Sequence, residues 1–200
     1  MTSTPPGSAD TARLLRRGFA LEYTTLAWNV IGIAVLAVAA VTARSVALAG
    51  FGLDSLIEIG ASTVVIWELS STGDDRRRRA MRLIGGAFVA LALYLLVQST
   101  WALSVGFHAH HSRVGIAWTA VTAVMMFALA VGKARTGAAL GNPVLEAEGR
   151  VTFIDGLLAT AVLLGLVLSV WGLWWADPLA GYVIVYYGIT EARAALQRRD

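Results

Sequence analysis

Long apolar runs follow one another along this chain, separated by short polar segments. About 20 apolar residues in helical conformation span the hydrocarbon core of a bilayer, which is roughly 30 Å thick. The runs predict six helices, at residues 18–42, 46–69, 82–105, 114–133, 149–172 and 173–194. They lack the alternation of a membrane β-barrel, so the predicted fold class is all-α, an integral membrane six-helix bundle.

The composition supports a membrane protein. Apolar residues make up 57% of the chain and charged residues 14%, and the mean hydropathy is +0.67, which is too apolar for an ordinary soluble domain. The polar first segment predicts a disordered basic cytoplasmic tail at residues 1–17, and the apolar runs predict one six-helix transmembrane domain at 18–200. Basic residues cluster between the apolar runs, so we expect a lipid bilayer and not nucleic acid as their partner.

The distribution of basic residues predicts the orientation. If six helices alternate, most basic side chains fall on one side of the bilayer, and only Arg44 and Arg113 fall on the other. By the positive-inside rule both termini are then cytoplasmic, in a multi-pass protein of the cell membrane. The residues on the basic side are Arg13, Arg16, Arg17, Arg76, Arg77, Arg78, Arg79, Arg82, Lys133, Arg135, Arg150, Arg193, Arg198 and Arg199.

Three carboxylates interrupt the apolar runs. Asp54 and Glu58 lie in the second predicted helix, and Asp155 lies in the fifth. A charged residue at the bilayer centre costs roughly 2.5–3.5 kcal/mol even on insertion scales, so such residues usually face the bundle interior and mark an ion path. Asp54 and Glu58 are one helical turn apart, close enough to share a cation.

Other polar residues extend this acidic region. On the fifth helix Thr152 lies three residues before Asp155, and Glu148 lies four residues before Thr152, so the three share one face. On the first helix Glu22 and Asn29 also share one face. Helix-end polarity and packing remain an alternative explanation for Glu22, Glu148 and Asn29. The candidate metal ligands are Asp54, Glu58, Asp155, Glu148, Glu22 and Asn29.

The second-helix stretch from Ser45 to Ser62, with Asp54 and Glu58, resembles the second helix of cation diffusion facilitators, in which a His or Asp and an Asp four residues later bind the transported metal. Asp155 stands 22 residues before Asp177, which lies in a segment similar to the start of that family's sixth helix. The resemblance covers about residues 18–195 and implies six helices, cytoplasmic termini and metal efflux.

Three features depart from the family pattern. Val151 occupies the position of the family's fifth-helix histidine, and Glu58 replaces an aspartate. Family members commonly continue into a cytoplasmic domain that dimerises, whereas this chain ends at Asp200. We therefore expect a homodimer to form through the membrane helices, and whether Glu148 replaces the missing imidazole is left open.

These observations predict a divalent cation efflux transporter that exchanges metal for protons. Close carboxylates in a poorly solvated cavity hold protons that a metal ion displaces. The resemblance puts Zn²⁺ first, while ligands that are all oxygen fit Mn²⁺ or Fe²⁺ as well. The transported metal is the only ion expected, with no prosthetic cofactor. The chain has no cysteine, so any metal is held by oxygen or imidazole.

Two further classes stay open beside transport. A non-transporting scaffold or a metal-sensing regulator would retain the same fold, and we expect no enzyme because no nucleophile motif or cofactor loop is present. The histidines gather at His108, His110 and His111 in the predicted outer loop. They either capture metal outside the membrane or belong to a solvated loop.

Overall fold

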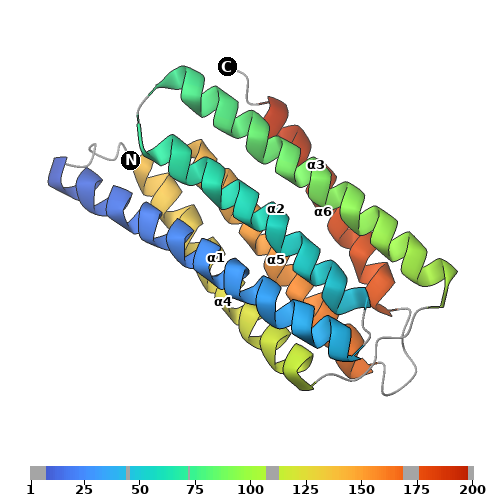
Figure 1. Cartoon of the computed structure of the whole chain (residues 1–200). Coiled ribbons are helices and arrows are strands. Elements are labelled where there is room, and N and C mark those ends of the chain that lie inside the picture. Colours follow the sequence, from blue (N-terminus) through green and yellow to red (C-terminus); the bar gives the residue numbers. More distant parts are fainter. Residues whose placement is uncertain (1–7, 44–45, 72, 107–112, 169–175, 198–200) are drawn as a thin grey trace.

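The computed structural model describes residues 8–43, 46–71, 73–106, 113–168 and 176–197. Within these ranges the chain is helical and contains no strand, which confirms the all-α class (Figure 1). The helices are α1 (Ser8–Ala43), α2 (Val46–Leu69), α3 (Asp74–Ser104), α4 (Arg113–Leu140), α5 (Pro143–Leu168) and α6 (Ala176–Gln197).

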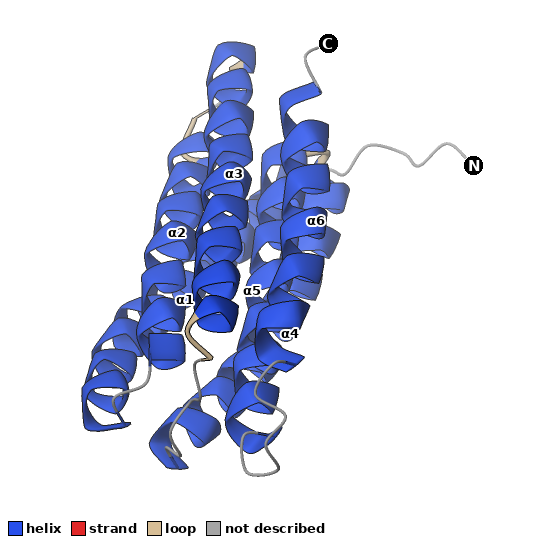
Figure 2. Cartoon of the chain, turned by 90° about the vertical axis from the view of Figure 1, so that its right-hand side faces the viewer, coloured by secondary structure: helices blue, strands red, loops and turns tan. Residues whose placement is uncertain are grey.

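Successive helices run in alternating directions along one bundle axis (Figures 1 and 2). The start of α1, the α2–α3 and α4–α5 connections and the end of α6 therefore gather at one end of the bundle. We call this the basic end, because nearly all arginines of the described ranges lie toward it, whereas Arg113 begins α4 at the opposite end. The basic end is the side that the sequence predicts to be cytoplasmic.

The predicted boundaries hold for α2 and fail at the starts of α1 and α3. The second helix runs from Val46 to Leu69, as expected. The first begins at Ser8, so residues 8–17, which the sequence assigns to a disordered tail, are helical. The third begins at Asp74, so the arginine run forms its first turns and not a loop. The length of an apolar run predicts only the part of a helix that crosses hydrocarbon. The prediction fails at these two starts because a helix can begin outside the hydrocarbon, in water or among lipid headgroups.

The connection between α4 and α5 is shorter than the sequence indicates. Helix α4 continues to Leu140 and not to 133, and α5 begins at Pro143 and not at 149. Gly141 has a φ of 60° and ends α4, with the Asn142 backbone N–H donating to the Gly137 carbonyl at 2.9 Å. The Asn142 side-chain oxygen accepts hydrogen bonds from two backbone N–H groups in the first turn of α5.

The remaining boundary lies between α5 and α6. The sequence predicts these helices at 149–172 and 173–194, whereas the structure ends α5 at Leu168 and begins α6 at Ala176. Asp177 consequently lies in the first turn of α6. His108, His110 and His111 fall outside the described residues, so their predicted role stays a prediction.

Five of the described helices, α1 to α5, are long and apolar enough to cross a membrane. Large apolar side chains on their outer faces are exposed, as at Val41 (79%), Val97 (68%) and Val124 (72%). In water such an apolar exterior is unfavourable, whereas lipid tails match it. The chain is a multi-pass membrane protein. A sixth span, the predicted orientation and the cytoplasmic termini stay predictions.

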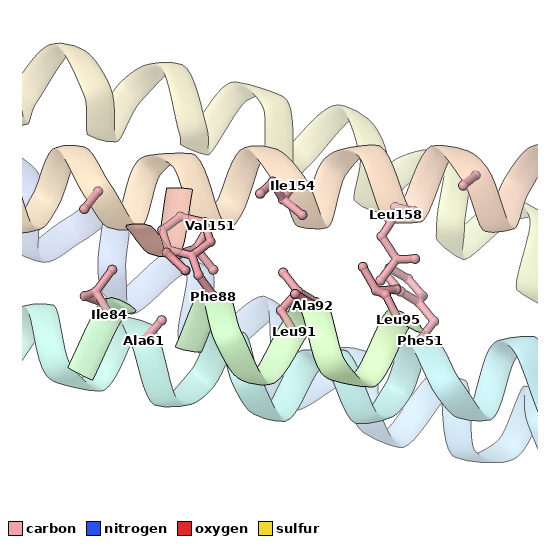
Figure 3. Packing of buried hydrophobic residues seen from close by; sticks show 14 of the residues in the cluster. Phe51, Ala61, Ile84, Phe88, Leu91, Ala92, Leu95, Val151, Ile154 and Leu158 are labelled. Atoms are coloured by element: carbon pink, nitrogen blue, oxygen red, sulfur yellow. The ribbon is translucent and has the colours of Figure 1, made fainter. Parts of the chain in front are cut away.

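Helix packing divides the bundle into two parts. Helices α1, α2, α4 and α5 contact one another, and α3 pairs with α6 along one side. An apolar cluster joins the two parts, with Val151, Ile154 and Leu158 of α5 among Phe88 and Leu91 of α3 (Figure 3). Val151 is thus part of the hydrophobic core, and the polar residues of α5 lie at other positions of the same helix.

Candidate cation site

Helices α2 and α5 bring the three predicted deep carboxylates together. Asp54, Glu58 and Asp155 are each only 2% exposed. The Asp54 and Asp155 side chains are close enough to interact across the two helices, and the charge of Asp155 also acts on Glu58. The four-residue spacing on α2 aims both of its acids at α5, because one helical turn separates them.

These carboxylates retain unused capacity for ligands. Both oxygens of Asp155, Oδ2 of Asp54 and Oε2 of Glu58 are buried without a hydrogen-bond donor. An unpaired buried carboxylate oxygen is costly, and binding a cation or a proton removes that cost. Three such side chains in one buried place make this region electronegative, and it is the candidate site for a cation.

A buried lysine adjoins these acids, and sequence reasoning assigned it to the wrong environment. The sequence places Lys133 among the basic residues at the membrane surface, but in the structure it is 0% exposed inside the bundle. Its Nζ lies 2.5 Å from Oε1 of Glu148 and 3.3 Å from Oε2 of Glu22, both of which are also fully buried. The error arose because α4 continues about two turns beyond the predicted end, which carries Lys133 inward.

Thr152 connects the lysine to the deep carboxylates. Its hydroxyl accepts a hydrogen bond from Lys133 Nζ at 3.0 Å and donates to Oε1 of Glu58 at 2.5 Å. The same hydroxyl lies 3.2 Å from Oε1 of Glu148, a longer alternative for its single proton. Ser62 of α2 donates to that Glu148 oxygen at 3.1 Å. A continuous polar network therefore runs from α1 through α4 and α5 to α2.

A glycine allows α5 to approach α4 closely beside this network. A Cβ placed on Gly149 would lie 3.2 Å from both Ala134 N and Lys133 Cβ, and 3.3 Å from Ala130 O. Most of these neighbours are backbone atoms that cannot rotate away. The close contact of the two helices holds Lys133 against Glu148, the residue that precedes Gly149.

Of the six candidate ligands, five belong to this network or to the deep site and one does not. Asn29 is buried, but its amide donates at 3.0 Å to the Thr25 carbonyl of its own helix. Glu22 and Glu148 contact the Lys133 ammonium. In the part of the chain that the structure describes, no three His, Cys, Asp or Glu side chains stand in a ready-made metal-ligand arrangement.

Sequence reasoning missed Lys133 and Ser62 as members of the network. The signal for Lys133 was present in Gly141, Asn142 and Pro143, a strong helix stop followed by a helix start. Placing the end of α4 at that stop would have moved Lys133 from the surface into the helix interior. No sequence signal singles out Ser62, because small hydroxyl residues also serve plain helix packing.

Ion pairs at the basic end connect the site helices α2 and α5 to α3 and α6. Buried Glu68 of α2 lies 3.7 Å from Arg77 of α3 and accepts a 2.7 Å hydrogen bond from the Asn142 amide. Arg150 of α5 pairs with Glu191 of α6 at 2.5 Å. These contacts link α2, α3, α5 and α6 where the helices emerge from the apolar core.

Comparison with known proteins shows similarity over part of the chain. No model of a known protein family matches the chain. The chain is 38% identical over 77 residues to a cation-efflux pump, FieF, of Shewanella oneidensis. The matched segment makes up 38% of this chain and 26% of the pump, so the similarity covers about a quarter of that protein's length.

Proposed function

We propose that this chain is a cation efflux transporter that carries divalent metal ions out of the cytoplasm through a site formed by α2 and α5. The observation that carries the proposal is the meeting of Asp54, Glu58 and Asp155 in the buried interior of a membrane bundle, with carboxylate oxygens that lack donors. Buried acids in a membrane protein are expensive and typically serve an ion pathway. The partial similarity to a cation-efflux pump supports the same function.

We place Zn²⁺ first among the transported ions, with Mn²⁺ and Fe²⁺ next. The deep site offers only carboxylate oxygens, which all three metals accept. Val151 supplies no ligand, because it lies in the apolar core with 1% of its surface exposed. A fourth ligand for Zn²⁺ then comes from water or from a hydroxyl such as that of Thr152.

Protons are the proposed counter-substrate. A carboxylate pair shielded from water binds either protons or a metal ion, so the two compete for one site. Rocking of the helices between inward-open and outward-open arrangements would then couple metal export to proton entry. We further propose that the transporter is a homodimer joined through its membrane helices and that it catalyses no chemical reaction.

Flux through purified protein in proteoliposomes tests the proposal. Vesicles containing a Zn²⁺-sensitive dye are expected to show Zn²⁺ uptake that requires a pH gradient, because metal and protons exchange. Asp54→Asn should lower the rate at least tenfold, since it removes a charged ligand. Asp74→Asn makes the same chemical change at an exposed position outside the site and should leave the rate within twofold of the natural chain.

Other outcomes have definite meanings. Zn²⁺ binding without flux would favour the metal-sensing regulator, and neither binding nor flux with Zn²⁺, Mn²⁺ or Fe²⁺ would favour the scaffold. Equal flux in Asp54→Asn and the natural chain would place the ion path elsewhere. Mn²⁺ or Fe²⁺ flux that exceeds Zn²⁺ flux would keep the transport function and change only the assigned substrate.

A further inference from the structure

We propose that the Lys133 ammonium is a resident cation that occupies the Glu22–Glu148 half of the acidic network, so that one chain binds one divalent ion and not two. The inference rests on the proposed function, because it concerns the number of metal ions that the same network takes. It makes Lys133 a determinant of stoichiometry and gives Glu22 and Glu148 a role other than ligating the transported metal.

The contacts divide the network into two halves. In the first half, Glu22 of α1 and Glu148 of α5 both face Lys133 Nζ, at 3.3 Å and 2.5 Å. In the second half, Asp54, Glu58 and Asp155 have no cation within ion-pair distance in the described structure. The ammonium therefore forms ion pairs in the first half only, although its charge also acts on Glu58 and Asp155 from a longer distance.

The first half has the composition of a cation site in its own right. Two fully buried carboxylates from different helices converge on one point, together with the hydroxyls of Thr152 and Ser62. Oε2 of Glu148 and both oxygens of Glu22 lack a hydrogen-bond donor, even though the Glu22 carboxylate lies near the ammonium. Without Lys133, these oxygens and hydroxyls would suit a second hard or borderline divalent ion.

Unlike a free metal ion, the Lys133 ammonium is covalently tethered beside Glu22 and Glu148. The Lys133 backbone is fixed in α4 and pressed against α5 at Gly149, so the ammonium cannot diffuse away. A second divalent ion would have to displace a group that competes at very high effective concentration. The deep half keeps its own place for a metal ion, because the Thr152 hydroxyl lies between the lysine and Glu58. The ammonium charge acts on Glu58 and Asp155 without forming an ion pair with either.

Isothermal titration calorimetry of purified protein in lipid nanodiscs tests this inference by measuring how many Zn²⁺ ions each chain binds. The natural chain is expected to bind one Zn²⁺, and Lys133→Met two, because the apolar variant keeps the length of the side chain and removes its charge. Lys133→Met combined with Glu148→Gln should return the number to one. Lys133→Arg, which keeps a cation in place, should also bind one.

The outcomes separate this inference from the proposed function. If the natural chain binds none of Zn²⁺, Mn²⁺ and Fe²⁺, the transport proposal fails. If the natural chain and Lys133→Met each bind one ion, or the natural chain already binds two, the resident-cation role is overturned while the deep site survives.

A second variant covers the case in which Lys133→Met does not fold. Glu22→Gln retains the shorter Lys133–Glu148 pair and is expected to bind one Zn²⁺ with a dissociation constant within threefold of the natural value. A loss of affinity greater than tenfold would make Glu22 a ligand of the metal and would contradict the division of the network.

Discussion

The buried ion pair of Lys133 with Glu148 and Glu22 is the least expected feature at the scale of single residues. Each of the three side chains is fully buried. Removing ions from water is costly, so removing one partner of a buried pair commonly destabilises a protein by about 3–5 kcal/mol, because the other charge is left uncompensated. Replacing all partners of a buried pair with well-packed apolar residues is often neutral or stabilising, so net stability alone does not account for this pair. Occupation of half of the acidic network is the role that we propose for it.

Thr152 provides a sharp prediction at the same scale. Thr152→Val keeps the shape of the side chain but removes the hydroxyl that joins Lys133 to Glu58. We expect it to lower the free energy of unfolding by about 1–3 kcal/mol, since a buried carboxylate oxygen and an ammonium each lose a partner. Unfolding by heat or denaturant in one detergent measures the change.

The matched control is Thr152→Ser, which preserves the hydroxyl and loses one methyl group. It should cost clearly less than the valine variant. If serine and valine destabilise the protein equally, packing of the Thr152 methyl group and not its hydrogen bonds would account for the loss.

At the scale of elements, the close approach of α4 and α5 decides where the ion pair forms. Gly149→Ala places a methyl group 3.2–3.3 Å from atoms of Ala130, Lys133 and Ala134. Overpacking of this kind typically costs about 1–3 kcal/mol, which exceeds the roughly 1 kcal/mol that alanine gains in helix propensity. We expect a lower melting temperature, and weaker Zn²⁺ binding because the pair beside the site shifts.

Gly60→Ala is the corresponding control on α2. Nothing lies within 4 Å of a Cβ at this exposed glycine, so only the gain in helix propensity remains. Its melting temperature should equal or exceed that of the natural chain. A Gly149→Ala protein that is as stable as Gly60→Ala would show that α4 and α5 are not tightly packed at this point.

At the scale of the whole molecule, the positive-inside rule predicts that the basic end faces the cytoplasm. The chain has no cysteine, so single cysteines can be introduced without background. Asp75→Cys lies at the basic end and Arg113→Cys at the opposite end. In intact cells a membrane-impermeant maleimide is expected to label Arg113→Cys, and to label Asp75→Cys only after lysis.

The cysteine-free natural chain should remain unlabelled in both preparations. The reverse pattern, with Asp75→Cys labelled in intact cells, would invert the bundle and turn the proposed efflux into uptake. Labelling at both positions in intact cells would contradict a single orientation.

The sequence by itself determined the fold class and the residues of the deep site. Apolar runs long enough to span hydrocarbon leave helices as the only structure that satisfies every backbone group within each segment, so an all-α bundle follows from local pattern alone. Asp54, Glu58 and Asp155 stand out for the same reason, because a carboxylate in an apolar run must find partners in the bundle interior. Whether they bind metal stays a prediction.

Only the tertiary structure decided what lies next to these acids. Lys133, Glu22 and Glu148 come from three helices, and their meeting depends on where α4 ends and how closely α5 packs against it. Distances between helices depend on side-chain packing over the whole bundle, which no local pattern encodes. For that reason the sequence predicts that Lys133 lies at the membrane surface, whereas in the folded protein it is a buried counter-ion of Glu22 and Glu148.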